Sequence, residues 1–270
     1  MTHHVRVESA GDMSWRLVHA DGEEIAAASA WVRPDGRCTL TISSAAHDAI
    51  AMIVPAVAAA TPEEILVNVR AGRADLRDQY AAAGFMEKRT EAVYAIGVEE
   101  AVRRSEGARL PSGVSAVPLS SVQEDELRVL DDALRQDVPG ADGWRWPPSD
   151  FREETYGAWF EPALYLVAVE DATSAPIGIA RVAIHAGRPP RLGFIGTSRP
   201  YRRTGVASAL LARIFAELSR RDVELITTEA DVENVASTTL LTSLGAERVG
   251  GFVVMALPSR APTSAGTDDG

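Results

Sequence analysis

Two distinct periods of apolar positions run along the second half of the chain. Between Ser120 and Gln136, Leu127, Leu130 and Leu134 recur at three- and four-residue spacing, which predicts one buried face of a helix. Short apolar runs separated by turn residues predict three strands in an antiparallel meander. The elements expected in this half are a strand at 113–119, helices at 120–136 and from Ser149 or Asp150, strands at 163–170, 177–185 and 192–197, a helix at 204–221, a strand at 223–229, a helix at 234–244 and a strand at 248–257.

The first half repeats this order with weaker signals. It predicts strands at 15–20, 25–32 and 38–43, a helix at 45–60, a strand at 64–69, a helix at 73–83 and a strand at 87–96. The segment from Leu76 to Phe85 aligns with the segment from Ser237 to Ala246, and in both a glycine comes directly before the last residue. An internal duplication explains the repeated order.

The pattern predicts an α/β (α+β) fold with two domains, each a mixed, mostly antiparallel sheet flanked by helices. We expect the domains at 1–98 and 113–257, with a linker at 99–112. The tail at 258–270 is rich in Pro, Ser, Gly, Thr and Asp and cannot bury apolar surface, so we expect it to be disordered.

Composition narrows the class of protein. The 270 residues are 46% hydrophobic and 24% charged, and no run reaches the ~18 consecutive apolar residues of a membrane span. The beginning of the chain has no apolar stretch after a basic flank, so we expect no secretory signal. Cys38 is the only cysteine, which excludes an intrachain disulfide and a thiolate metal cluster. We therefore expect a cytoplasmic protein without a metal, and the net charge of −11 argues against nucleic acid as a partner.

The segment from Gly196 to Leu211 carries the clearest chemical signal. A strand ends near Thr197, a turn with cations and small residues follows, and a helix begins near Thr204. Backbone N–H groups in the first turn of a helix have no intrahelical acceptor and form an anion site together with the helix dipole. Gly205 would let a phosphate approach closely, and Arg202 would add charge. The alternative is an ordinary strand, turn and helix with solvated arginines.

This segment resembles motif A of the GNAT N-acetyltransferase superfamily, through Arg202-x-x-Gly205-x-Ala207. The strand 223–229, followed by Asn234 and Gly245, resembles motif B. The resemblance implies two tandem GNAT-like domains, of which the first is degenerate, and acetyl-CoA as co-substrate. It implies pairing of the pantetheine arm with the backbone of the strand end, binding of the pyrophosphate by the loop and helix start, and a contact from Asn234. The implied cofactor-binding residues are Ile195, Gly196, Thr197, Arg202, Arg203, Thr204, Gly205, Val206, Ala207, Ser208 and Asn234.

The residues for proton transfer depart from the family pattern. Seven residues after the motif B asparagine the superfamily often has a tyrosine that protonates the leaving thiolate, and this chain has Leu241 there. Glu229 and Asp231 end the strand that lines the acceptor cleft in related enzymes, and either could accept the amine proton. The alternative for both is a solvated carboxylate. Tyr201 is expected to pack, and His185 to be an exposed turn residue.

Two further segments give expectations for the binding of the amine acceptor and for the first of the two sequence repeats. Trp144 and Trp146 lie in a loop that covers the acceptor site in related enzymes, so they could stack on a ring or sugar or could pin the loop to the core. Residues 43–49 offer no glycine and no arginine or lysine, so the first copy is not expected to bind the cofactor. Tyr80 in that copy is expected to have a core or interface role.

The sequence therefore predicts an enzyme that acetylates a small-molecule amine by direct attack in a ternary complex. The alternative is a non-catalytic module that binds or senses acyl-CoA, which the leucine at position 241 favours. The acidic surface would favour a cationic acceptor, and lysine side chains of proteins stay open as acceptors. We expect no membrane partner, and either a monomer that is an internal pseudo-dimer or a homodimer.

Overall fold

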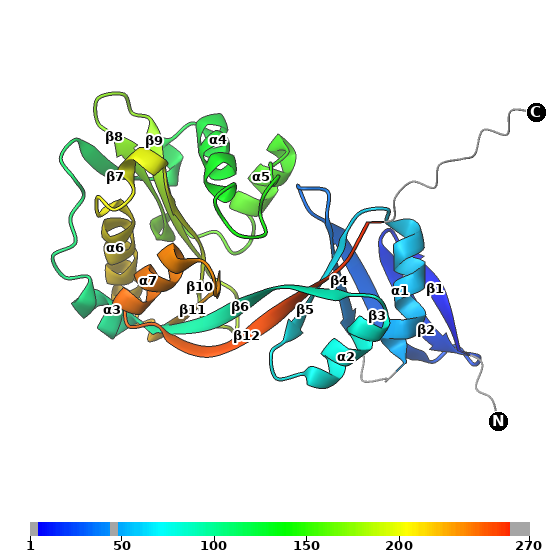
Figure 1. The fold of residues 1–270 in the computed structure, drawn as a ribbon. Helices are drawn as coiled ribbons and strands as arrows, with labels where there is room; N and C mark the ends of the chain where they lie inside the picture. Colours follow the sequence, from blue (N-terminus) through cyan, green and yellow to red (C-terminus); the bar gives the residue numbers. More distant parts are fainter. Residues whose placement is uncertain (1–4, 44–47, 260–270) are drawn as a thin grey trace, which may run out of the picture. The chain divides into compact units, whose positions relative to one another are not determined.

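The structure is a computed structural model that describes residues 5–43 and 48–259 (Figure 1). The chain divides into two compact units. Of the described residues, the first unit comprises 5–43, 48–90 and 252–259, and the second unit comprises 91–251. Each unit is described by itself below.

The first unit is a mixed sheet with helices. Its strands follow the order β1-β2-β3-β4-β5-β12 and are antiparallel except for the parallel pair of β4 and β5. Helix α1 links this parallel pair and packs Ile53 and Val57 into the core of the unit. The bounds are β1 Val5–Gly11, β2 Ser14–His19, β3 Glu24–Val32, β4 Cys38–Ser43, α1 Ala49–Ala60, β5 Ile65–Arg70 and α2 Ala74–Ala82.

The second unit repeats the parallel pair with β10 and β11, linked by α6. Its strand order is β12-β6-β11-β10-β9-β8-β7. The bounds are β6 Met86–Gly97, α3 Val98–Arg104, β7 Val114–Pro118, η1 Leu119–Ser121, α4 Glu124–Arg135, α5 Pro148–Thr155, η2 Pro162–Leu164, β8 Tyr165–Glu170, β9 Pro176–Ala183, β10 Arg191–Thr197, η3 Arg199–Tyr201, α6 Val206–Arg220, β11 Leu225–Asp231, α7 Val235–Ser243 and β12 Glu247–Leu257.

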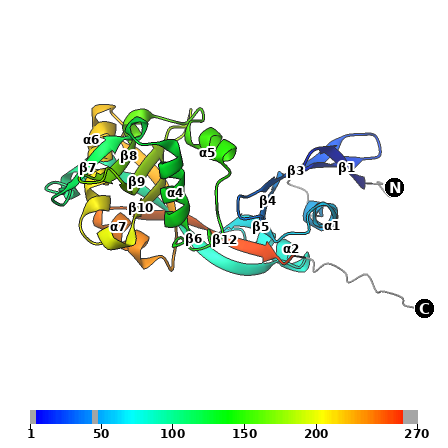
Figure 2. The ribbon, with the colours of Figure 1, turned by 90° about the horizontal axis from the view of Figure 1, so that it is seen from above.

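Successive apolar side chains of the central strands β8 and β9 point to opposite faces of the sheet, and both faces are buried. Ala168 and Ala180 pack with α6, whereas Val167 and Ile179 pack on the opposite face with the leucines of α4. Helices α6 and α4 accordingly lie on opposite sides of β8 and β9 (Figures 1 and 2). The sheet is thus held between two helical layers, and β10 and β11 are placed at its centre.

The units do not coincide with the predicted ranges 1–98 and 113–257, because two long strands cross the boundaries. The second half of β6 pairs with β11, from Glu91↔Asp231 to Gly97↔Leu225. The second half of β12 pairs with β5 in the first unit. The last strand of the first repeat, β6, therefore pairs with a strand of the second repeat, and the last strand of the second repeat, β12, pairs with a strand of the first.

The predicted helices and strands are confirmed to within a few residues, and the mixed α/β class is confirmed. Strand β1 was missed, although Val5 and Val7 alternate with polar residues there. Within the predicted linker 99–112, α3 occupies Val98–Arg104, and its buried Ala101 packs with α6. The predicted tail lies outside the described residues from position 260 onward. In the portion that the structure describes, no helix is long and apolar enough to cross a membrane.

Candidate active site

The two parallel strands at the centre of the second unit separate soon after they meet. Their ladder holds the pair Arg191↔Thr227, and the Thr228 hydroxyl donates to the Leu192 carbonyl at 2.9 Å. The pairing of β10 with β9 shifts register between Leu192 and Phe194, which marks a β-bulge at Gly193. A cavity of about 180 Å³, here called the strand cleft, lies between residues 192–195 of β10 and residues 228–231 of β11.

Helix α7 contributes one wall of the strand cleft. The Asn234 side chain caps this helix by accepting the N–H of Ser237 at 3.1 Å, and both residues line the cleft. Leu241 also lines it and is 3% exposed. A leucine side chain has no proton to donate to a leaving thiolate. Among the described residues that line the cleft, Ser237 and Thr228 carry hydroxyl groups, and the sequence analysis did not select either of them.

The loop between β10 and α6 contains two residues in the left-handed region. Arg203 has φ +62° and Gly205 has φ +95°, and α6 begins at Val206. Two left-handed residues so close together turn successive backbone N–H groups toward one side, and the first-turn amides of α6 add to them. A Cβ atom at Gly205 would lie 3.3 Å from the Arg109 carbonyl oxygen, so both its space and its φ favour glycine.

Two arginines beside this loop share one carboxylate. Arg199 donates to Asp137 at 2.6 Å, and Arg202 donates to the other oxygen of the same carboxylate and, at 3.1 Å, to the Thr197 carbonyl. These hydrogen bonds, first from Arg199 and then from Arg202, lower the pKa of Asp137 to about 2. Asp137 therefore offsets part of the positive charge near the predicted pyrophosphate site.

The predicted cofactor residues gather along one path. Ile195 and Asn234 line the strand cleft, and Gly196 and Thr197 end β10 directly before the loop. The rest form the loop and the start of α6, namely Arg202, Arg203, Thr204, Gly205, Val206, Ala207 and Ser208. Thr204 is engaged by a hydrogen bond from its hydroxyl to the Tyr201 carbonyl at 2.6 Å, and the Val206 side chain is buried in the core.

The two predicted proton acceptors lie in the cleft but have other contacts. Glu229 accepts from Arg191 on the neighbouring strand at 2.6–2.7 Å. Asp231 is 8% exposed and accepts the N–H of Glu233 at 2.8 Å. Tyr201 lies apart from the cleft, and its hydroxyl donates to Glu170 at 2.7 Å.

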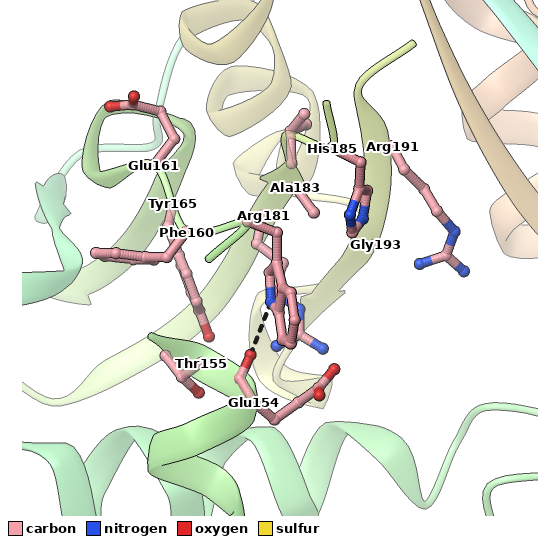
Figure 3. A pocket seen from close by; sticks show the side chains of 12 residues that line it. Glu154, Thr155, Phe160, Glu161, Tyr165, Arg181, Ala183, His185, Arg191 and Gly193 are labelled. Carbon is pink, nitrogen blue, oxygen red and sulfur yellow. Dashed lines mark hydrogen bonds between the residues drawn. The ribbon is translucent and has the colours of Figure 1, made fainter. Parts of the chain in front are cut away.

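A second cavity of about 250 Å³, here called the aromatic pocket, lies on the other side of β10 (Figure 3). Glu154 and Thr155 come from α5, Trp159 and Tyr165 from the following segment and β8, and Arg181 from β9. The pocket shares two lining residues, Arg191 and Gly193, with the strand cleft. The two cavities therefore adjoin at the bulge of β10.

Most residues of the aromatic pocket were not predicted from the sequence. The exception is His185, which is exposed as expected but also lines the pocket, with its ring centroid 6.1 Å from that of Trp159. Arg181 interrupts the apolar run Ile177-Gly178-Ile179-Ala180 of a central strand. This charged side chain in an otherwise apolar strand could have indicated the pocket. A charge is costly to bury, so it is found in a buried strand where it has a partner or a function.

Trp144 and Trp146 line neither cavity. Trp146 is 5% exposed, and its indole N–H donates to Asp131 at 3.0 Å. The Arg135 guanidinium pairs with the same carboxylate and lies 5.0 Å and 5.3 Å from the centroids of the two indole rings. The contacts correspond to the pinning alternative, in which the loop is fixed to α4.

The described residues contain no cluster of three or more His, Cys, Asp or Glu side chains that could hold a metal ion.

Comparisons with known proteins agree with this geometry. Residues 129–246 match the Acetyltransferase (GNAT) family. A GCN5-related N-acetyltransferase from Sphaerobacter thermophilus is similar over 94% of this chain and 83% of its own, with a TM-score of 0.70 and 19% identity. A tandem GNAT protein from the clavulanic acid biosynthesis pathway is similar over 92% and 83%, with a TM-score of 0.64 and 17% identity.

A GCN5-related N-acetyltransferase from Kribbella flavida is also similar, over 95% of this chain and 90% of its own, with a TM-score of 0.56 and 17% identity. No curated protein sequence matches the chain. At these identities the solved structures show a shared fold, while the family match covers the separated strands, the loop and α6. Residues 129–246 of the second unit thus match the GNAT acetyltransferase family, and the chain shares its fold with GNAT N-acetyltransferases of known structure.

Proposed function

We propose that the protein is an acetyl-CoA-dependent N-acetyltransferase that acts on a small-molecule amine by direct attack in a ternary complex. The observation that carries the proposal is the separation of β10 from β11 directly before a left-handed loop at the start of α6. A cleft between strands suits a thin pantetheine arm, and the loop suits a pyrophosphate.

The residues present fit acetyl-CoA. The amides from Arg203 to Ser208 and the side chain of Arg202 would hold the pyrophosphate, because these N–H groups lie at the positive end of a 15-residue helix. The backbone of 195–197 would bind the pantetheine arm, and Asn234 would contact it from α7. When bound, acetyl-CoA supplies an activated acetyl group on a thioester.

The chain's own contribution is mainly positional. When two reactants are held in the adjoining cavities at the bulge, a bimolecular step becomes effectively unimolecular. This can lower the activation free energy by about 7–11 kcal/mol. Glu229 faces the cleft in its pair with Arg191 and could accept the amine proton through water. Asp231 has the weaker case, because its carboxylate already caps a backbone turn.

A second candidate is a non-catalytic module that binds or senses acyl-CoA. The buried Leu241 favours it, since this position offers no acid for a leaving thiolate. The two candidates share the same binding site and differ only in turnover.

Calorimetric titration with acetyl-CoA, followed by an assay of thiol release with a panel of amines, separates them. Binding with amine-dependent thiol release supports the enzyme. Binding without turnover for any amine supports the sensing module, and the absence of binding contradicts both.

For the first unit we propose a degenerate copy of the same fold. The supporting observation is the repeated path β4-α1-β5-α2-β6 and β10-α6-β11-α7-β12, in which a helix joins two parallel strands. We further propose that this copy binds no cofactor, that the protein acts in the cytoplasm without a nucleic-acid or membrane partner, and that it is a monomer or a homodimer.

A further inference from the structure

Two guanidinium groups converge beside the bulge of β10. A Cβ atom placed on Gly193 would lie 3.5 Å from Nη1 of Arg191 and 3.9 Å from Nε of Arg181. The strand thus has no side chain at the point that both arginines approach. Gly193 also lines both cavities, so this point is where the aromatic pocket meets the strand cleft.

The charges at this point are unbalanced. Arg191 is paired with Glu229, but Arg181 forms no ion pair with a carboxylate among the described residues. Burial acts to lower the pKa of Arg181, yet the nearby Tyr165, Asp131 and Glu154 raise it overall, so the guanidinium stays charged. Two like charges that approach one open position favour an anion there, and a planar guanidinium fork matches a carboxylate.

The rest of the pocket suits a small molecule with a flat apolar part. Trp159 is fixed in place, because its indole N–H donates to the Glu154 carbonyl at 3.0 Å and its carbonyl accepts the N–H of Ile184 at 3.1 Å. Phe160 packs edge-on against Tyr165 with centroids 6.2 Å apart. A volume of about 250 Å³ is the liquid volume of roughly eight water molecules at about 30 Å³ each, which excludes a folded partner.

One hydroxyl group in the pocket points to a polar group on the ligand. The Thr155 hydroxyl is buried and has no hydrogen-bond partner within the described part of the chain, whereas the Tyr165 hydroxyl interacts with Arg181. The Tyr165 hydroxyl points toward Thr155, away from Gly193 (Figure 3). Buried hydroxyls are normally satisfied, so a ligand that reaches this end would supply the partner.

We propose that the acceptor is a small amine that also carries a carboxylate, bound over Gly193 by Arg181 and Arg191. This inference rests on the proposed acetyltransferase function and adds the substrate class. The flat part of the acceptor lies along Trp159 and Phe160, and its far end reaches Thr155. An amine next to a carboxylate at Gly193 faces the strand cleft, where the acetyl group would be presented.

Three matched probes test the carboxylate directly. Tyrosine, tyrosine amide and tyramine share the amine and the phenol ring and differ in the group beside the amine. We expect calorimetry on the wild-type protein to show at least 10-fold tighter binding of tyrosine than of the other two, since charge-assisted hydrogen bonds are worth about a factor of ten or more. Equal affinities for the three probes would overturn the proposal.

Paired variants locate the effect. Arg181→Met should remove the preference for tyrosine over tyramine, while Arg188→Met, an exposed arginine in the β9–β10 turn, should retain it. Gly193→Ala adds a methyl group at an ordinary contact distance, so the fold should persist while tyrosine binding weakens about 10-fold. The matched control Gly250→Ala, a strand glycine whose added Cβ would also have room, should bind tyrosine like the wild type.

The outcomes distinguish a failure of the proposed acceptor class from a failure of the proposed acetyltransferase function. Turnover of amines in general with no preference for a carboxylate would overturn the acceptor class and leave the acetyltransferase intact. Tyrosine-selective binding that depends on Arg181, without turnover of any probe, would support the pocket and contradict the enzyme. A preference that survives both Arg181→Met and Gly193→Ala would show that the carboxylate is bound elsewhere.

Discussion

At the scale of single residues, Asp137 lowers the positive charge of the proposed phosphate loop by pairing with two of its arginines. Its carboxylate joins Arg199 and Arg202, which are otherwise exposed on the loop side of the second unit. An incoming phosphate competes with this carboxylate for the same donors. The loop is thus less positive than its sequence suggests.

We predict that Asp137→Asn strengthens CoA binding several-fold at low salt, because it frees two guanidinium groups for the phosphates. The gain should fall as salt rises, since screening weakens exposed charge interactions. Titration calorimetry at two ionic strengths measures it. Unchanged or weaker binding would show that Asp137 positions the arginines rather than competing for them.

The same residue predicts a pH dependence. Arg199 and Arg202 lower the pKa of Asp137 to about 2 from 3.8, so its stabilising effect is complete above about pH 4 and is lost as pH falls toward 2. We expect the difference in Tm between wild type and Asp137→Asn to be present at pH 5 and to vanish near pH 2. A difference that persists at pH 2 contradicts the assignment.

Trp146 tests whether the tryptophan loop is structural. Trp146→Phe removes the indole donor to the fully buried Asp131 carboxylate, and we expect a loss of about 1–3 kcal/mol in the free energy of unfolding. Because Trp146 lines neither cavity, KM for the amine should not change. Denaturant unfolding and steady-state kinetics measure the two quantities, and a raised KM with normal stability would restore the substrate-binding interpretation.

At the residue scale, backbone requirements could be predicted better than side-chain roles. Gly205 was predicted because a glycine lets a phosphate approach the backbone closely, and its φ of +95° gives a second reason for glycine at this position. The pairing of Glu229 with Arg191 and the meeting of Arg181 with Gly193 were not foreseen. Both depend on strand register and on a bulge, and the hydrophobic pattern specifies neither.

At the scale of elements, the loop and the start of α6 together form the proposed anion site. We predict that Gly205→Val weakens CoA binding at least 10-fold, because a β-branched residue is strained at this φ and its Cβ would lie 3.3 Å from the Arg109 carbonyl. Gly113→Val is the matched control, since Gly113 also has positive φ but an added Cβ meets no atom within 4 Å. Equal loss of binding in both variants would mean that strain in the unit, and not the loop, is responsible.

Most elements follow from local pattern, and the exceptions have physical reasons. Helix α4 and the strands β8 to β11 have clear periodicity, so their positions could be predicted. Helix α3 was taken for a linker because its seven residues are mostly charged. Only Val98 and Ala101 are buried, and so short an apolar face gives no periodic signal.

At the scale of the whole chain, exchange of the two long strands could not be predicted. The last strands of the two repeats, β6 and β12, are similar. Their sequences do not indicate that β6 will pair with β11 of the second repeat and β12 with β5 of the first repeat. The predicted boundaries at 98 and 257 therefore follow the repeats, whereas the compact units follow the pairing.

Met255 tests this exchange. It belongs to the repeat that carries the candidate active site, yet it is 2% exposed in the core of the first unit. We predict that Met255→Ala destabilises by about 2–5 kcal/mol and raises hydrogen exchange in β2, α1 and β5, with CoA affinity unchanged. Increased exchange in α6 and β10 instead would contradict the exchanged arrangement.

The central claim is that the second unit transfers an acetyl group from acetyl-CoA to an amine. The most direct measurement is mass spectrometry of the amine and the coenzyme after incubation of the protein with acetyl-CoA labelled in the acetyl group. The account predicts labelled N-acetyl product in equal amount to free CoA, with both reduced at least 10-fold in Gly205→Val. Tight binding of acetyl-CoA with no labelled product from any amine tested would contradict it.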